Sequence, residues 1–432
     1  MKKNVIILAI ECLRPKNLSM FGYGKETDKH LKELSGECLL FTNYFSVSNA
    51  TMPSISSIFS GKYPPEIGMV HQIPYVTQED IEKLKKNKFW LPIYLRNLGY
   101  ETISLDNIGL WLKRGFNVLP EAKESKIKEF IRRSFIRKIL LIMPSWLYSF
   151  GKKIIKTRAS PTFPPSEKII DSAIEKIEKA DKPFFMYMRL EDTHFPFLSL
   201  KKQRGKRNNE AEKILERIES QTQKEYVKKR FDDAGLYNME DIRERYDSGL
   251  INTDKEIGRF VRFMKKKGIW KNTILVILGD HGENFDEHGV YFSRSGIYDT
   301  SIHTLLMLHV PGVKAKKIEG FAQNVDIAPT ILNYLGEKTK IKLSGFSLKP
   351  LIKKGAGKRN KIFAYDCFSN ETSCVRTKKE KLILSKNPKC YLCKANHHKG
   401  KEYYKIEKDN EEKNNLYKPG NKLEKFLEVK NG

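Results

Sequence analysis

Four polar residues have the types and positions needed for metal-assisted ester chemistry: Glu11, Thr51, Asp280 and His281. Glu11 follows one apolar run and Asp280-His281 follows another, so each lies where a buried strand is expected to end. Carboxylate and imidazole groups are common ligands of divalent metals. A hydroxyl beside such an ion can attack an ester and form a covalent intermediate. These residues predict a metal-dependent centre with Thr51 as its nucleophile.

Thr51 lies in a segment, 49–61, that is expected to start a helix. Pro53 suits a first helical turn, and Ile55, Ile58 and Phe59 form an apolar face. A hydroxyl at a helix start lies at the positive end of the helix dipole, which also favours an anionic phosphate or sulfate ester. Threonine is an ordinary helix cap as well. Thr51 is therefore a candidate nucleophile only in combination with the predicted metal ligands elsewhere in the chain.

Three further histidines are candidates for contact with the substrate. His194 follows a predicted strand, and a cationic or hydrogen-donating imidazole there would stabilise negative charge on the ester oxygens or on the leaving group. His288 and His303 follow the Asp280-His281 pair and are predicted as further substrate-binding donors. A lone histidine before an aromatic residue, as in His194-Phe195, also fits a purely structural role.

The elements that must position these residues alternate along the chain. Asn4–Ile10 and Thr273–Gly279 are continuous apolar runs, which are typical of central strands covered on both faces. Because parallel strands need crossover connections, the alternation with helices predicts an α/β fold whose mainly parallel central sheet has helices on both faces. The other expected strands are Tyr100–Leu105 and Pro183–Leu190, and the expected helices include Asp28–Gly36, Trp90–Leu98, Ser166–Ala180 and Arg243–Lys267.

The chain of 432 residues is long enough for one large domain and a smaller one. We expect a catalytic domain over residues 1–350 and an α+β subdomain over 351–432. The subdomain is predicted to contain a small antiparallel sheet and a closing helix.

A basic insertion over about residues 121–160 interrupts the first domain. Its apolar residues recur at helical spacing from Ile127 to Ile155, among many lysines and arginines. Such a segment can lie on an anionic membrane surface, or it can be a lid that packs on its own domain. Its charge agrees with the net charge of +28, which suggests an acidic partner. We find no nucleic-acid-binding motif, so no nucleic acid is expected.

The first apolar run ends at Glu11 and lacks a cleavage site, and no run approaches the roughly 20 residues needed to span a bilayer. A cytoplasmic protein is therefore expected, with peripheral contact at the inner membrane face left open.

Cys390 and Cys393 have the spacing of a metal or redox pair, with His397 and His398 behind them. Since no second such pair accompanies them, unpaired thiols in a hairpin loop are the favoured interpretation over a zinc site.

The ordered set of motifs resembles the sulfatase branch of the alkaline phosphatase superfamily over nearly the whole chain. The residues that carry this resemblance are Asn4 to Arg14, Thr51-x-Pro53-Ser54, Ser60 to Pro64, Asp192-x-His194-x-Pro196, Tyr246-Asp247 to Asp254, Asp280 to Glu283, Glu287-His288-Gly289, Pro311-Gly312 and Val325 to Thr330. The resemblance implies one divalent ion (manganese, zinc, magnesium or calcium) bound by Glu11, Thr51, Asp280 and His281.

The chain departs from the sulfatase pattern at the nucleophile. Sulfatases have a cysteine or serine, oxidised to formylglycine, at the position of Thr51, and Glu11-Cys12 replaces their paired aspartates. With its threonine the chain is similar to the phosphoethanolamine transferases and lipoteichoic acid synthases. This implies a hydrolase or transferase that acts through a covalent Thr51 intermediate and prefers phosphate esters. The expected substrate is an anionic ester, either lipid-linked or part of a polymeric glycan. A sulfatase proper and a catalytically silent binder of anionic glycans or lipids are the alternatives.

Overall fold

A twisted sheet of eight strands forms the centre of the molecule in the computed structural model, which describes residues 2–72, 75–106, 109–117, 164–197, 210–355, 357–369, 371–387, 389–397 and 400–428. The strand order is β3-β4-β1-β5-β6-β2-β7, and β8 also pairs with β2. The strands are β1 (Asn4–Ile10), β2 (Leu39–Phe45), β3 (Glu101–Leu105), β4 (Phe184–Leu190), β5 (Thr273–Gly279), β6 (His303–His309), β7 (Lys316–Ile318) and β8 (Ala322–Gln323).

The sheet is mainly parallel. Strand β1 lies between β4 and β5 and is parallel to both, and β3 is parallel to β4. Strand β6 is antiparallel to both of its neighbours. The carboxyl ends of β1, β4 and β5 therefore meet at one edge of the sheet, where ligands of such folds collect.

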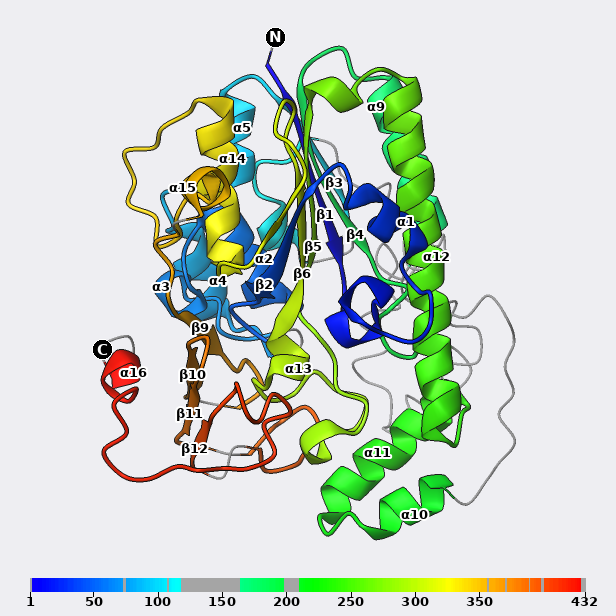
Figure 1. The fold of residues 1–432 in the computed structure, drawn as a ribbon, viewed down its shortest axis with the longest axis vertical. Helices are drawn as coiled ribbons and strands as arrows, with labels where there is room; N and C mark the ends of the chain where they lie inside the picture. Colours follow the sequence, from blue (N-terminus) through cyan, green and yellow to red (C-terminus); the bar gives the residue numbers. More distant parts are fainter. Residues whose placement is uncertain are drawn as a thin grey trace, which may run out of the picture.

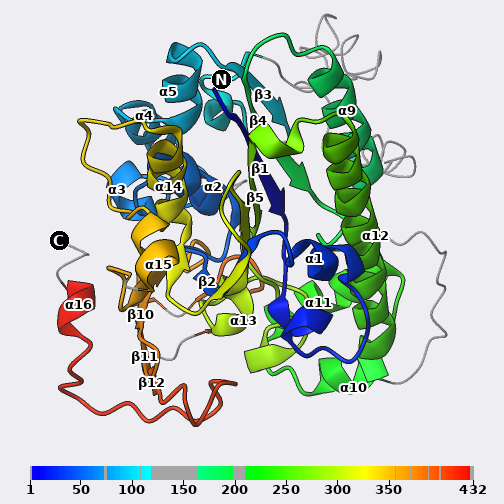
Figure 2. The ribbon, with the colours of Figure 1, turned by 45° about the horizontal axis from the view of Figure 1, so that its top comes forward.

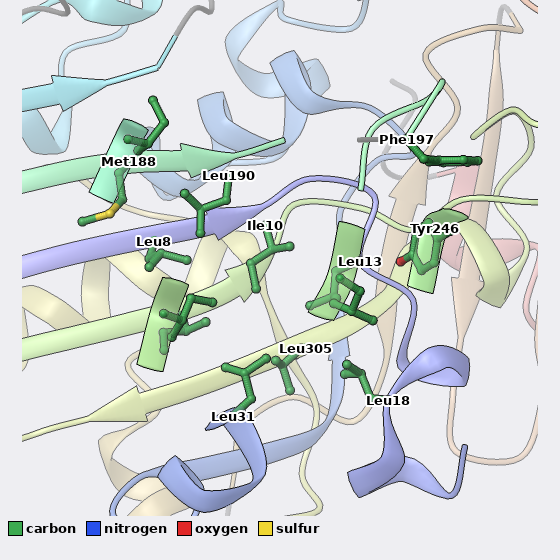
Figure 3. Close-up of a cluster of buried hydrophobic side chains, with 14 of the residues drawn as sticks. Leu8, Ile10, Leu13, Leu18, Leu31, Met188, Leu190, Phe197, Tyr246 and Leu305 are labelled. Atoms are coloured by element: carbon green, nitrogen blue, oxygen red, sulfur yellow. The ribbon is translucent and has the colours of Figure 1, made fainter. Parts of the chain in front are cut away.

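One face of the sheet is covered by α1 (Lys29–Leu34), α9 (Ser166–Glu178) and α12 (Met239–Lys266) (Figure 1). Helix α12 packs against both α1 and α9 (Figure 2). Figure 3 shows part of the apolar cluster beneath them, including Leu8 and Ile10 from β1, Leu190 from β4 and Leu31 from α1. Two further helices, α10 (Glu210–Glu216) and α11 (Gln221–Ala234), continue this layer toward the carboxyl edge.

The opposite face carries a second apolar cluster. Val5, Ile7 and Ala9 of β1 point into it, whereas Ile6 and Leu8 belong to the first cluster, as the two-residue period of a strand requires. The covering helices are α2 (Thr51–Ser60), α3 (Pro64–Ile67), α4 (Gln78–Lys85), α5 (Leu91–Asn97), α14 (Ile327–Leu335) and α15 (Lys349–Lys354).

A separate antiparallel sheet of order β12-β11-β10-β9 lies beyond the carboxyl edge of the main sheet (Figure 1). Its strands are β9 (Ile362–Tyr365), β10 (Thr372–Arg376), β11 (Lys381–Ser385) and β12 (Lys401–Tyr404), and α16 (Lys425–Glu428) packs on it near the end of the chain. The remaining short elements are α13 (Asp299–Ile302) and the 3-10 turns η1 (Pro15–Asn17), η2 (Ser19–Phe21), η3 (Leu110–Lys113), η4 (Trp270–Asn272), η5 (Glu287–Gly289) and η6 (Asn324–Asp326).

The predicted fold class is confirmed, and the two central strands have the predicted bounds. The Asp28 carboxylate precedes α1 but forms no capping hydrogen bond with it. It accepts hydrogen bonds from the backbone N–H groups of Ser19 and Met20, while Asp254 of α12 accepts those of His30 and Leu31 at the start of α1. A carboxylate from a neighbouring helix can satisfy these donors as well as a local one can.

The basic insertion over 121–160 lies outside the described residues, so its two interpretations stay predictions. The division of the chain at residue 350 also stays a prediction. Among the described residues, no helix combines the length and the apolar composition required to cross a membrane.

Candidate functional site

Thr51, Glu11 and His281 meet at the carboxyl edge of the main sheet. Glu11 and Asp280 follow paired residues at the ends of β1 and β5, because Ile10 lies opposite Gly279. Thr51 begins α2, and its Oγ1 lies 3.1 Å from Glu11 Oε1 and 3.2 Å from His281 Nε2. All of these side chains are buried. The structure thus brings together four predicted site residues that are far apart in sequence.

The two carboxylate oxygens of Asp280 differ in their hydrogen bonding. Its Oδ1 accepts hydrogen bonds from the backbone N–H groups of Cys12, at 3.3 Å, and His281, at 2.9 Å. Its buried Oδ2 has no hydrogen-bond donor among the described residues and lies 3.7 Å from His281 Nε2. A buried carboxylate oxygen without a donor is costly, so this geometry fits a bound cation.

His281 has the tautomer that a metal ligand needs. Its Nδ1 donates to the Gly282 carbonyl at 2.8 Å, which leaves the lone pair of Nε2 directed toward Thr51. Burial lowers the pKa of His281 to about 4, against the opposing effect of Asp280. The ring is therefore neutral near pH 7, and its Nε2 is available to an ion or to the Thr51 hydroxyl.

Cys12, which was not among the predicted metal ligands, joins this group. Potential ligand atoms of Glu11, Cys12 and His281 all lie within 4.8 Å of one another. Cys12 has a left-handed φ of 55°, and its Sγ lies 3.6 Å from a Glu283 carboxylate oxygen. Burial, followed by Glu283, raises the pKa of the Cys12 thiol well above its ordinary value, so the thiol is protonated in the metal-free protein.

Two arginines that were not predicted complete the site. Arg189 of β4 forms buried ion pairs with Glu11 and Glu191. Arg294 Nη1 lies 3.5 Å from Glu11 Oε1 and 3.2 Å from His194 Nε2. The sequence contained a signal for Arg189, because it is the single charged residue of an otherwise apolar strand. Arg294 lies in an irregular loop and offered no such signal.

His194 lies at the more accessible side of the site. Its side chain is 19% exposed, whereas that of Glu11 is 3% exposed. Its Nδ1 donates to the Phe195 carbonyl at 2.7 Å, so Nε2 can accept a hydrogen bond from Arg294. Burial, aided by Arg294 and other arginines, lowers the pKa of His194 well below its ordinary value. This shift favours a neutral His194, beside which Arg294 supplies positive charge, while the expected contact of His194 with the substrate stays a prediction.

The structure does not bring His288 and His303 into the hydrogen-bonded group around Thr51. The His288 ring stacks on Tyr298, with the ring centroids 3.6 Å apart. The His303 ring stacks on Phe45, and its Nε2 donates to the Thr42 carbonyl at 2.9 Å. Both rings thus contact residues outside this group, and their role in substrate binding stays a prediction.

The loop before Thr51 is held by the second sheet. Asn49 Nδ2 donates to Asp366 Oδ1 at 2.8 Å and to the Gly296 carbonyl at 3.0 Å, while its Oδ1 accepts from the Cys367 N–H at 3.1 Å.

We expect Asn49→Ala to lower the free energy of unfolding by about 1–3 kcal/mol, because these buried groups lose their partner. Urea unfolding monitored by tryptophan fluorescence would measure the change, and an unchanged midpoint would contradict it.

Comparison with protein-family models finds two matches. A family model described as Sulfatase matches residues 3–337. The chain belongs to the sulfatase family. A second model, described as N-sulphoglucosamine sulphohydrolase, C-terminal, matches residues 286–431. Members of the sulfatase family generally bind a divalent metal, and the residues around Asp280 Oδ2 fit such an ion.

Two curated sulfatases and one solved structure are similar to the chain. Arylsulfatase K of Canis lupus familiaris is 33% identical over 114 residues, which cover 26% of the chain and 21% of that protein. An ulvan-active sulfatase of Formosa agariphila is 23% identical over 364 residues, covering 82% of the chain and 65% of that protein. The chain therefore spans less than two thirds of the length of these relatives.

The solved structure shows another protein in complex with that protein's substrate, D-glucosamine-2-N,6-O-disulfate. It superposes with a TM-score of 0.67 at 18% identity, covering 100% of the chain and 97% of that protein. At this identity the likeness supports the fold alone. Sulfated sugars are thus bound by a protein of this architecture.

Proposed function

We propose that the chain hydrolyses sulfate esters of a glycan, with Thr51 as the attacking group. The observation that carries this proposal is the meeting of Thr51 with Glu11, Asp280 and His281 in a chain of the sulfatase family. Relatives named for ulvan and for a glucosamine disulfate support a sulfated glycan as the substrate class. This departs from the phosphate preference expected from the sequence, and the match to sulfatases is the reason.

The reaction follows from the contacts of Thr51. Its Oγ1 attacks the ester sulfur, a new O–S bond forms, and the bond from sulfur to the glycan oxygen breaks. Glu11 Oε1, at 3.1 Å, accepts the hydroxyl proton and passes it on to the glycan oxygen, so the glycan leaves as an alcohol. Water then attacks the sulfothreonine, releases sulfate and restores the Thr51 hydroxyl.

Glu11, Asp280 and His281 would hold the divalent ion, with Cys12 as a further ligand within reach. When bound, such an ion polarises an ester oxygen and lowers the pKa of a neighbouring hydroxyl. Arg294 faces the accessible side of the site and would stabilise negative charge on the sulfuryl oxygens. Arg189 holds Glu11 in place through their buried ion pair.

A specific observation favours phosphate-ester hydrolysis or transfer as a second candidate. Thr51 occupies the position at which sulfatases carry formylglycine, and a threonine cannot be converted to that aldehyde. An unmodified hydroxyl can attack a phosphoryl centre and later be displaced from it. The two candidates differ in the element that becomes attached to Thr51.

A paired substrate screen distinguishes these candidates. Purified protein is loaded in turn with manganese, zinc, magnesium and calcium and is then given aryl sulfate, sulfated glucosamine, phosphate monoester and phosphodiester substrates. We expect release of sulfate from the glycan substrate by the wild type and no release by Thr51→Ala. After a rapid quench, mass spectrometry should find sulfate on the peptide that contains Thr51.

Thr51→Ser is the matched variant, because it retains a hydroxyl at the same position and removes only the methyl group. Serine should retain part of the turnover if an unmodified hydroxyl attacks. If phosphate is found on Thr51, and if only the phosphate esters are turned over, the protein is a phosphate-ester hydrolase or transferase. Absence of turnover on every ester would favour a catalytically silent glycan-binding protein.

A further inference from the structure

Two cysteines and one histidine gather outside the catalytic group. Cys390, Cys393 and His397 belong to the loop between β11 and β12, and each is at most 3% exposed. Their potential ligand atoms lie within 4.8 Å of one another, and Cys393 Sγ is 2.6 Å from His397 Nε2. Two thiols and an imidazole facing one another in a buried loop form the ligand set of a thiophilic metal ion.

The backbone of this loop presents the three side chains on one side. Lys394 N–H donates to the Cys390 carbonyl at 3.1 Å, and Cys390 N–H donates to the Ala395 carbonyl at 2.9 Å. Lys394 has a left-handed φ of 66°, which is uncommon for a residue with a side chain. This sharp turn returns the chain so that His397 lies beside Cys393.

We propose that Cys390, Cys393 and His397 bind a zinc ion that fixes this loop against the wall of the active site. Binding releases the two thiol protons, and two thiolates balance the charge of Zn²⁺, so a buried neutral unit results. Among the described residues these three form the complete ligand group, and a water molecule takes the fourth tetrahedral position. The single Cys-x-x-Cys pair was insufficient evidence in the sequence, whereas the position of His397 supplies a third ligand.

The loop is joined to the catalytic group through Ser295. Cys390 Sγ lies 3.2 Å from Ser295 Oγ, and a Cys390 thiolate would accept the hydroxyl proton in a hydrogen bond. Ser295 follows Arg294, whose guanidinium approaches both Glu11 and His194. An ion at this loop would therefore act as a structural element that positions Arg294, without contact with the substrate.

The test measures the metal content of the full chain, so it does not depend on any ester being hydrolysed. Cys393→Ser and His397→Ala should each lose one zinc ion per chain relative to the wild type. Cys374→Ser is the matched control, because this buried cysteine belongs to a different apolar cluster and should retain the wild-type content. In cobalt-loaded Cys12→Ser protein, where the catalytic site has no thiol, the thiolate-to-cobalt absorption should persist, and the addition of Cys393→Ser should reduce it.

A measurement on the wild type covers the case in which a variant fails to fold. Cys390 and Cys393 should resist alkylation by a maleimide in zinc-loaded protein and should react after a chelator is added, as mapped by peptide mass spectrometry. Equal zinc content in the wild type and both variants would overturn the proposal. A disulfide between Cys390 and Cys393 in zinc-supplemented protein would overturn it as well.

Discussion

Asp280→Asn is expected to remove the divalent ion and to reduce kcat by about 10³-fold or more, because an ion that stabilises transition-state charge contributes several kcal/mol. Asparagine keeps the shape of the side chain and the Oδ1 acceptor for the N–H groups of Cys12 and His281. It replaces the buried Oδ2, which has no donor among the described residues, by a neutral group. The variant should therefore fold normally while its affinity for the ion falls.

The experiment compares Asp280→Asn with Asp286→Asn. Asp286 lies in the following loop, its side chain is 39% exposed, and its ion pair with Arg243 lies at the surface. Metal content, kcat at saturating metal and thermal unfolding are measured for both variants. The control should match the wild type in all three. If Asp280→Asn keeps both the ion and full turnover, Glu11, Asp280 and His281 are not the ligand set.

The second prediction concerns the free energy of unfolding and the buried ion pairs that join the small sheet to the rest of the chain. Lys381 of β11 is fully buried, and its Nζ lies 2.9 Å from Asp299 Oδ1 and 2.6 Å from Glu412 Oε1. Arg376 also pairs with Asp299, at 2.9 Å. Although burial lowers the pKa of Lys381, the two carboxylates outweigh it and raise that pKa above its ordinary value. The ammonium is therefore charged, and it neutralises two buried acids.

Lys381→Met should lower the free energy of unfolding by about 3–5 kcal/mol, because it leaves the buried Glu412 carboxylate without its cation and Asp299 with Arg376 alone. Burial already raises the pKa of Glu412 to about 7, so this carboxyl can take up a proton in the variant. The loss should consequently be smaller at acidic pH than above pH 7. Urea unfolding at both pH values measures it.

Lys379→Met is the matched control from the same hairpin. Its side chain is 73% exposed and lies 3.8 Å from Glu407, so the loss should stay within about 0.5 kcal/mol. Equal unfolding midpoints for Lys379→Met and Lys381→Met would show that the buried ion pairs do not stabilise the contact between the sheets.

The α/β fold class and the positions of the main elements could be predicted from the sequence. Strands β1 and β5 are continuous apolar runs, and each ends at a polar residue that became part of the site. Thr51 was found in the same way, because Pro53 and the apolar spacing after it indicate a helix start. These properties are local, since hydrophobic periodicity reports directly on which side of an element is buried.

The full set of side chains that share the site could be recognised only from the folded chain. Strand β1 lies between β4 and β5, so Glu11 has Arg189 on one side and Asp280 on the other, although both are far away in sequence. The same packing brings Arg294 to His194 and directs His303 toward Thr42. Strand order and loop paths follow from how two apolar faces are covered at once, and no local pattern in the chain contains that information.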